Sequence, residues 1–393
     1  MSQHDTAKLA EQAYDYLDHG DLMSAKALFE QICQVDVGNA EAWMMLGAVR
    51  GEMGDSEGAI ASLGQAIILQ PENAEAHYSM GRVLQMLGRL EEALQHNQQA
   101  VTIDPGFADA WVAMGVIKAM LGELFQSAFY CRHAARLQPE SAQAHMNLAN
   151  VLLQQGKIDE AIDSYSTTLA LQPASPLACF MLAKCYLQEN DIERAETSCR
   201  QAINLDPHIV DAHFTLGDIY RTQNRINEAI EAYQRVVALQ PDFSQAHYYL
   251  GHGHTVCGRY AEAVSSYQAA IQYDPTLRDA HTGLGFALHA SGKHAEAVAV
   301  FRKALEIGPE TAEIYSHLGN AYYSLKNLDD AEGIIHKVLS ELNPYTTLSS
   351  HLVTRELGRW LVKNTEGRGI LKSAFEMNVS VYIPAFTDSE LGL

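Results

Sequence analysis

The chain is poor in basic residues. Its 393 residues include 27 Lys and Arg against 48 Asp and Glu, which gives a formal net charge of −21. Nucleic acids require clusters of Lys and Arg on the protein that binds them, and an anionic membrane surface attracts the same side chains. Neither nucleic acid nor membrane is therefore an expected partner, whereas long-range electrostatic steering favours a basic protein or peptide.

Long apolar runs and paired cysteines are also missing. No stretch approaches the roughly 18 apolar residues that a membrane-spanning helix needs. The first residues, MSQHDTAKLAEQAYDYL, lack the apolar core of a secretory signal. The six cysteines include no CxxC pair and fall mostly inside predicted helices, a pattern typical of reduced thiols. We therefore expect a cytoplasmic protein.

Motifs of the common enzyme classes are absent as well. The chain has no Walker-type loop, no GxSxG elbow and no HExxH motif. The stretch HYYLGHGH, from His247 to His254, is a candidate metal cluster. No pair of its histidines has the i, i+4 spacing that places two ligands on one helix face. We therefore predict no catalytic residue, no cofactor and no metal site.

What the chain does contain is a 34-residue repeat. It runs from Thr6 to Tyr345 in ten copies, which begin at residues 6, 40, 74, 108, 142, 176, 210, 244, 278 and 312. Position 8 of each copy is Gly or Ala, and position 20 is Ala or Ser, so these positions predict the close crossing of two helices within each copy. Position 24 is often aromatic and is expected to pack against the next copy. Position 32 is proline in eight copies, which ends the second helix.

The repeat resembles the tetratricopeptide repeat (TPR) family. The second copy, AEAWMMLGAVRGEMGDSEGAIASLGQAIILQPEN, has the family's signature residues at the matching positions: Trp43, Leu46, Gly47, Ala59, Ala66 and Pro71. The Trp or Tyr common at position 4 is replaced by histidine in five copies: His77, His145, His213, His247 and His281. The resemblance implies an all-α, right-handed superhelical solenoid of about ten helix–turn–helix repeats that binds other proteins.

In this family, positions 2, 5, 9, 12 and 13 of the first helix line a concave groove. The resemblance therefore implies a peptide-binding groove lined by Met44, Tyr78, Arg82, Met146, Asn150, Phe180, Lys184, Phe214, Arg221 and Tyr248. Exposed apolar residues in a row usually mark a contact site, and Met and aromatic side chains suit peptide recognition. The alternative is that some of these side chains pack laterally between neighbouring first helices, and the sequence leaves both interpretations open.

The period stops after Tyr345. Residues 346–364 have the apolar spacing of one amphipathic helix, which would cover the open face of the last copy. Two segments, RELGRWL (355–361) and ILKSAFEMNVSVYIPAFTDSELG (370–392), resemble part of the deoxyhypusine synthase family, whose members use NAD to transfer an aminobutyl group from spermidine. Asp388 matches an acidic residue near the cofactor and substrate of that family. Its glycine-rich segment and nucleophilic lysine have no counterpart here, so no synthase activity is expected.

These observations predict four segments. Residues 1–5 form an N-terminal tail, residues 6–345 the ten repeats, residues 346–364 a capping helix, and residues 365–393 a short α/β-like tail with a strand at 379–386. The expected function is a non-catalytic scaffold that binds an extended peptide or helix in its groove. The alternative is a partial deoxyhypusine synthase-like protein, active with NAD and polyamine only when another chain completes it. Self-association through the tail is a further expectation.

Overall fold

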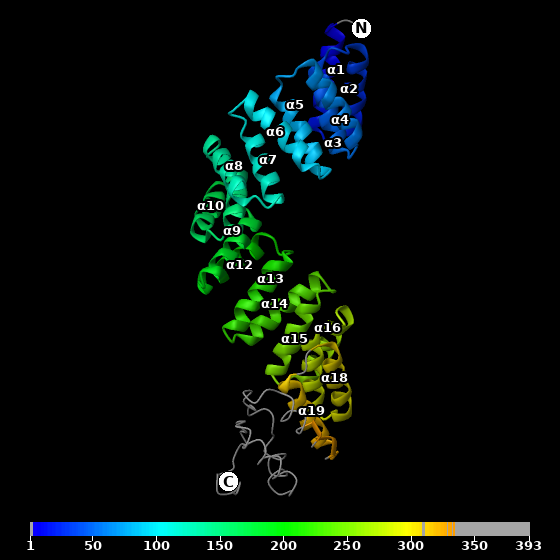
Figure 1. Cartoon of the computed structure of the whole chain (residues 1–393), viewed down its shortest axis with the longest axis vertical. Helices are drawn as coiled ribbons and strands as arrows, with labels where there is room; N and C mark the ends of the chain where they lie inside the picture. Colours follow the sequence, from blue (N-terminus) through cyan, green and yellow to red (C-terminus); the bar gives the residue numbers. More distant parts are fainter. Residues whose placement is uncertain (1–2, 309–310, 328, 332, 335–393) are drawn as a thin grey trace. The chain divides into compact units, whose positions relative to one another are not determined.

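The computed structural model describes residues 3–308, 311–327, 329–331 and 333–334, and every regular element within them is a helix (Figure 1). The chain divides into two compact units, residues 1–205 (unit 1) and 206–393 (unit 2). The helices of unit 1 are α1 (Gln3–Asp18), α2 (Leu22–Val35), α3 (Ala40–Glu52), α4 (Ser56–Leu69), α5 (Ala74–Met86), α6 (Leu90–Ile103), α7 (Ala108–Met120), α8 (Leu124–Leu137), α9 (Ala142–Gln154), α10 (Ile158–Leu171), α11 (Pro176–Gln188) and α12 (Ile192–Leu205). Those of unit 2 are α13 (Val210–Thr222), α14 (Ile226–Leu239), α15 (Ser244–Val256), α16 (Tyr260–Tyr273), α17 (Arg278–Ala290), α18 (His294–Ile307) and α19 (Ala312–Ser324).

The helices are arranged as stacked hairpins. Each odd-numbered helix is the first helix of a copy and packs against the following even-numbered second helix. First helices also contact each other from copy to copy: α3 contacts α5, α5 contacts α7 and α7 contacts α9 in unit 1, and α15 contacts α17 and α17 contacts α19 in unit 2. One short hairpin cannot bury its own apolar face, so the stack supplies the core. The predicted all-α repeat architecture is confirmed.

All ten copies make the same turn between their first and second helices. Position 15 has a positive φ in each copy: Gly20, Gly54, Gly88, Gly122, Gly156, Asn190, Asn224, Gly258, Gly292 and Lys326. Glycine adopts this left-handed conformation without steric cost, and asparagine tolerates it better than most residues do. Lys326, with φ of 59°, extends the turn to the tenth copy. The second helix of that copy is described only at residues 329–331 and 333–334.

The two helices of a copy approach closely at position 8. A Cβ added to Gly217 would lie 2.7 Å from the Tyr233 ring, and one added to Gly251 would lie 2.7 Å from the Tyr267 ring. The side chain at position 24 therefore packs against position 8 of its own copy. The predicted contact with the next copy is made by the other side of the ring, where Tyr233 stacks on Tyr249 with 5.3 Å between the centroids.

A hydrogen bond from position 4 ties each of seven copies to the copy before it. The indole N–H groups of Trp43 and Trp111 donate to the carbonyls of Val37 and Pro105 at 3.1 and 3.0 Å. In five further copies a histidine Nε2 lies 2.9–3.1 Å from a proline carbonyl, in the pairs His77–Pro71, His145–Pro139, His213–Pro207, His247–Pro241 and His281–Pro275. Histidine can replace tryptophan here because an imidazole N–H reaches the same acceptor.

His145 provides a test of this hydrogen bond. His145→Phe keeps a ring but removes the donor, and we expect it to lower the free energy of unfolding by about 0.5–1.5 kcal/mol. His145→Trp keeps an N–H donor and should cost clearly less. Urea unfolding followed by far-UV circular dichroism compares the two variants. Equal losses would show that ring packing rather than the hydrogen bond matters at position 4.

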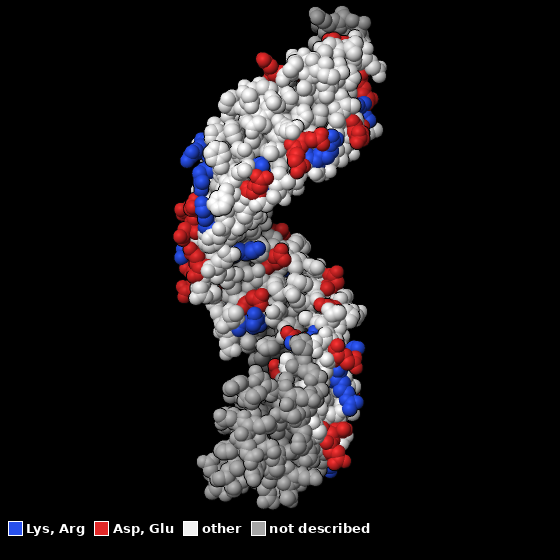
Figure 2. Space-filling model, viewed as in Figure 1, with Lys and Arg blue, Asp and Glu red and all other residues white. Residues whose placement is uncertain are grey.

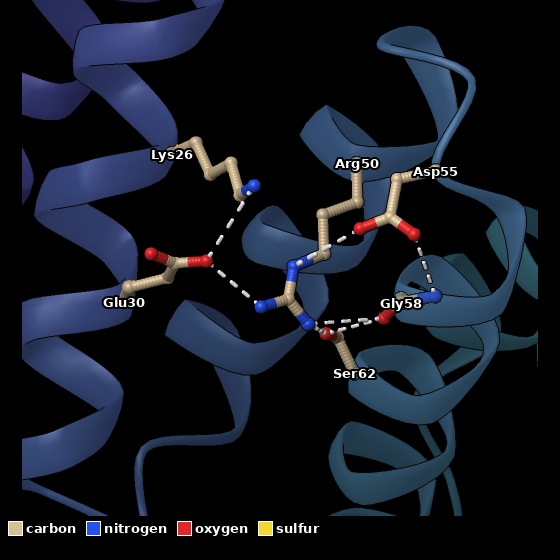
Figure 3. Close-up of polar contacts among 6 residues, drawn as sticks. All are labelled: Lys26, Glu30, Arg50, Asp55, Gly58 and Ser62. Atoms are coloured by element: carbon tan, nitrogen blue, oxygen red, sulfur yellow. Dashed lines mark hydrogen bonds and ion pairs between the residues drawn. The ribbon is translucent and has the colours of Figure 1, made fainter.

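A polar junction joins the first two copies in unit 1 (Figure 3). Arg50 on α3 extends between α2 and α4, with its Nη2 at 2.8 Å from Glu30 Oε1. Its Nη1 donates to Ser62 Oγ at 2.9 Å and to the Gly58 carbonyl at 3.2 Å. Glu30 also pairs with Lys26 at 3.8 Å. This half-buried arginine thus has acceptors in both copies, and the junction combines charge with apolar packing.

The cysteines of the chain are free thiols, and five of the six are buried. Burial raises the pKa of Cys131 to about 11, so this thiol stays neutral and serves as a packing residue. In the part of the chain that the structure describes, no helix combines the length and the apolar character needed to cross a membrane.

Some predictions fall outside the described residues. They are the capping helix at 346–364, the strand at 379–386 and the position of Asp388. At the other end, α1 begins at Gln3, inside the segment predicted as an N-terminal tail.

Candidate functional site

The residues predicted to bind a peptide all lie on first helices. In unit 1 they are Met44 on α3, Tyr78 and Arg82 on α5, Met146 and Asn150 on α9, and Phe180 and Lys184 on α11; in unit 2 they are Phe214 and Arg221 on α13, and Tyr248 on α15. We call the side chains at positions 2, 5 and 9 of the first helices, together with Arg221 and Tyr249, the first-helix face of each unit. Because neighbouring first helices contact each other, this face continues from copy to copy within a unit.

Three of the predicted residues belong to the core. Met44, Met146 and Phe180 are at most 8% exposed. The expectation of an exposed apolar stripe is therefore wrong at these three positions, where the lateral packing that the sequence left open is found instead. At Met44 and Met146 the reason is the direct contact of first helices, α3 with α5 and α7 with α9, which encloses the position 5 side chain. Met44, for example, shares a core cluster with Met80 of the next copy.

Two cations of unit 1 lie beside aromatic rings. Arg82 Cζ is 6.0 Å from the centroid of Tyr78, and Lys184 Nζ is 5.9 Å from the centroid of Phe180. Both cations are exposed. Asn150 is already engaged, because its Oδ1 accepts a hydrogen bond from the Tyr165 hydroxyl at 2.6 Å. Arg82 and Lys184 can therefore reach a ligand, whereas Asn150 has only its amide N–H to offer.

Carboxylates at position 2 lie beside tyrosines of the preceding copy. The Tyr14 hydroxyl donates to Glu41 Oε1 at 2.7 Å. Burial raises the pKa of Tyr78, an effect that Arg82 opposes and the Asp109 carboxylate reinforces. Glu41 and Asp109 are both exposed. The first-helix face of unit 1 thus places a half-exposed ring next to a carboxylate in contact with solvent.

Unit 2 contains a connected group of rings, the aromatic cluster, which consists of Phe214, Tyr233, Phe243, Tyr248, Tyr249 and Tyr267. Phe214 lies 5.0 Å from Phe243, and Tyr248 lies 5.0 Å from Tyr249 and 6.0 Å from Tyr267, between centroids. Tyr233 and Tyr267 are buried, whereas Phe214, Tyr248 and Tyr249 are half-buried. The half-buried rings leave aromatic surface that a ligand can contact.

Arg221 lies at the edge of the aromatic cluster. Its Cζ is 4.8 Å from the centroid of Tyr249, and its Nη2 is 3.1 Å from Asp218 Oδ1. Asp218 also accepts a hydrogen bond from the Tyr233 hydroxyl at 2.8 Å. Burial and then the Asp218 charge raise the pKa of Tyr233 far above its ordinary value, so this hydroxyl stays protonated. Arg221 is therefore fixed in place and its charge is balanced.

Tyr248 repeats in unit 2 the arrangement of Tyr78 in unit 1. Burial raises the pKa of Tyr248, and the Asp279 carboxylate of α17 raises it further. Asp279 is exposed. A half-buried tyrosine and an exposed carboxylate from the following copy therefore recur on the first-helix face of both units.

The histidine-rich stretch does not form a ligand cluster. His247 Nε2 lies 2.9 Å from the Pro241 carbonyl, the same contact that the histidines at position 4 of other copies make. His254 is buried, and His252 is half-buried beside Arg221, whose charge affects it. Within the described ranges, no group of three or more His, Cys, Asp or Glu side chains could hold a metal ion.

Two residues that sequence reasoning missed are Phe125 and Phe129 on the second helix α8, both exposed. The residue types at position 18 of the repeat could have pointed to Phe125. Position 18, which is Phe125 in the fourth copy, is Asp or Glu in five other copies. Met86 and Met120 at position 13 are also exposed, although they occupy a position that the resemblance assigns to the groove.

Acid is expected to weaken unit 2 through His252. Burial and then the Arg221 charge lower the pKa of His252, so the folded state resists a proton that the unfolded chain accepts below pH ~6.5. The free energy of unfolding should therefore fall as the pH drops from about 7.5 to about 5.5. It should fall less in His252→Gln. Urea midpoints at the two pH values check this, with His208→Gln at an exposed loop position as the control. An unchanged pH dependence in His252→Gln would contradict the assignment.

Three TPR sequence models match the chain. One, described as TPR repeat, matches residues 217–254, 255–292 and 287–326, and two described as tetratricopeptide repeat match residues 152–200 and 49–106. Together they cover more than half of the 393 residues. A model described as deoxyhypusine synthase matches residues 311–393. This match begins well before the segments that suggested the resemblance, and it includes α19.

Solved structures of helical repeat proteins are similar to parts of the chain. The crystal structure of MamA protein has 28% identity, covers 43% of this chain and 93% of its own, and has a TM-score of 0.41. YrrB, described as a TPR protein with an unusual peptide-binding site, has 19% identity, coverages of 50% and 97%, and a TM-score of 0.42. A tetratricopeptide repeat protein from Parabacteroides merdae has 17% identity, coverages of 64% and 99%, and a TM-score of 0.47. No curated protein sequence matches the chain.

Proposed function

Because the chain belongs to the tetratricopeptide repeat family, we propose that it is a non-catalytic scaffold that holds an extended peptide or a helix of a partner protein against its first-helix face. The repeats account for most of the described chain and serve protein interaction.

One observation carries the proposal. On the first-helix face of both units, the charge of an exposed carboxylate of the next copy acts on a half-buried tyrosine, as for Asp109 on Tyr78 and Asp279 on Tyr248. An aromatic face next to a carboxylate suits a Lys or Arg side chain, which gains a cation–π contact and an ion pair at the same place. The net charge of −21 steers a basic partner toward the chain over long range.

The partner is therefore a peptide whose basic side chains recur along its length. On unit 2, the apolar groups of such a peptide contact the half-buried rings of the aromatic cluster. On unit 1, considered by itself, the exposed cations Arg82 and Lys184 are available to its carbonyl oxygens. Phe180 contributes to the shape of the face from within the core. Its low exposure makes it a poor probe of binding, since its removal would disturb packing as well as recognition.

Tyr248 and Asp279 offer the cleaner test. The double variant Tyr248→Ala, Asp279→Asn removes one ring and one carboxylate from the first-helix face, and we expect recovery of specific partners to fall at least about fivefold. Affinity purification with quantitative mass spectrometry measures the recovery, and raising the salt concentration should weaken it in the wild type.

A matched control is available on the second helix of the same unit. Tyr273→Ala with Glu262→Gln removes an exposed ring and an exposed carboxylate of α16 and should leave recovery unchanged. Far-UV circular dichroism must show equal helix content in all three proteins. Recovery of the same partners in the same amounts by the Tyr248–Asp279 variant would refute binding at this face.

The match to deoxyhypusine synthase over residues 311–393 favours a second candidate, a polyamine enzyme that needs another chain to complete it. We propose that this chain alone does not bind NAD, because α19, which lies at the start of the matched segment, is built into the repeat stack. Isothermal calorimetry of the full chain with NAD should show no saturable heat. Saturable binding that is lost in Asp388→Ala would support the enzyme instead.

A further inference from the structure

Helix α8 in unit 1 exposes two phenylalanines on its outer surface. Phe125 is 83% exposed and Phe129 is 63% exposed. They are four residues apart, so they lie on the same side of the helix, one turn from each other. The opposite side of α8 is turned to the core, where Ala128 and Cys131 are buried. These exposed rings therefore do not contribute to the packing of the hairpin.

The rings also depart from the repeat pattern. Phe125 is at position 18, which is acidic in five copies: Glu57, Glu91, Asp159, Glu193 and Asp329. Phe129 is at position 22, where no other copy has a residue larger than glutamine or glutamate. Apart from Met23 at position 18 of the first copy, the other copies have small, polar or charged residues at both positions. Large apolar side chains on a surface that the fold leaves polar are typical of a contact site.

The charge of α8 is as unusual as its rings. Each of the other second helices from α2 to α18 contains at least one Asp or Glu, whereas α8 contains none and has Arg132 and Arg136 instead. Figure 2 shows basic side chains gathered over α8, beside acidic ones over α10. Arg132 Nη2 pairs with Glu160 Oε2 of α10 at 2.7 Å, and Arg136 is exposed.

The four side chains form one stripe. Residues 125, 129, 132 and 136 follow the i, i+4, i+7, i+11 spacing, which keeps them on a single side of an α-helix. We call Phe125, Phe129, Arg132 and Arg136 the α8 stripe. It combines two apolar anchors at one end with two positive charges at the other, on a chain whose net charge is −21.

We propose that the α8 stripe is a second docking surface, which binds an acidic amphipathic helix of another protein. The helix would place apolar side chains, spaced four residues apart, over Phe125 and Phe129, and Asp or Glu one to two turns away over Arg132 and Arg136. This recognition mode needs an apolar row and complementary charge along one helix. It is independent of the first-helix face and selects the opposite charge.

Charge argues against the other occupants. A second copy of this chain, seated by twofold symmetry on the same stripe, would bring four arginines together. An anionic membrane is a broad surface that would also face the acidic side chains over α10 beside the stripe, whereas a single helix can cover the stripe alone (Figure 2). An acidic helix pairs with the local positive charge and covers the two rings at the same time.

The test is a peptide selection on the full-length protein. A display library of helix-forming peptides of about 16 residues, randomised at all outward positions, is selected on the wild type and counter-selected on Phe125→Ala, Phe129→Ala. The surviving peptides should be enriched in Asp and Glu together with apolar residues spaced by four. By fluorescence anisotropy, a selected peptide should bind the double variant at least about tenfold more weakly.

Two further variants separate charge from general surface effects. Arg132→Glu with Arg136→Glu should also weaken the selected peptide at least about tenfold, whereas neutral Gln replacements should weaken it less. Met23→Ala is the matched control, because Met23 is an exposed apolar residue at the same repeat position in α2, and it should leave binding unchanged. Circular dichroism should show the helix content of the wild type in each variant.

The following results would overturn the proposal. One is a selected pool without acidic enrichment, or no peptide that distinguishes the wild type from the phenylalanine variant. Another is self-association, seen by light scattering and lost in that variant, which would assign the stripe to a second copy. Cosedimentation with phosphatidylserine vesicles that depends on Phe125 and Phe129 would assign it to lipid.

Discussion

The two helices of each copy meet where a small residue at position 8 faces the side chain at position 24. At Gly285, an added Cβ would lie 2.5 Å from the Phe301 ring, so the backbone of the first helix is nearly in contact with that ring. The position 24 side chain also reaches the following copy, as where Tyr233 stacks on Tyr249, and first helices of successive copies contact one another. The continuous first-helix face depends on that contact, because without it each hairpin would present an isolated surface.

Packing between neighbouring copies leaves position 5 side chains with different exposure. Met44, Met146 and Phe180 are buried, whereas Tyr248 is half-buried although α15 contacts α17. Carboxylates at position 2 stay exposed beside the rings of the preceding copy. The outer side of the second helices is free of such constraints, and on α8 it has the opposite charge. One acidic chain thereby offers two surfaces that suit partners of different chemistry.

The last described helix, α19, packs as a repeat helix although it lies in a segment that matches an enzyme family. Residues 311–393 match a model of an NAD-dependent enzyme family, yet α19 packs in the repeat stack through Ile314, Leu318 and Ala321. The turn that follows it has a residue with positive φ, Lys326, at the same repeat position as the other nine turns. Within the described part of this segment, the repeat geometry and not the resemblance accounts for the contacts.

The helices and their register were determined by the sequence alone, because these features depend on local residue types at fixed spacing, such as the small residue at position 8 and the proline at position 32. Histidine at position 4, as at His145, could be read from the sequence, but its acceptor, the Pro139 carbonyl, could not. Only the tertiary structure decided that Met146 is buried, that Arg82 is exposed beside Tyr78 and that Phe125 faces solvent. Exposure depends on how closely neighbouring copies approach, and that distance is set by contacts between residues far apart in the chain.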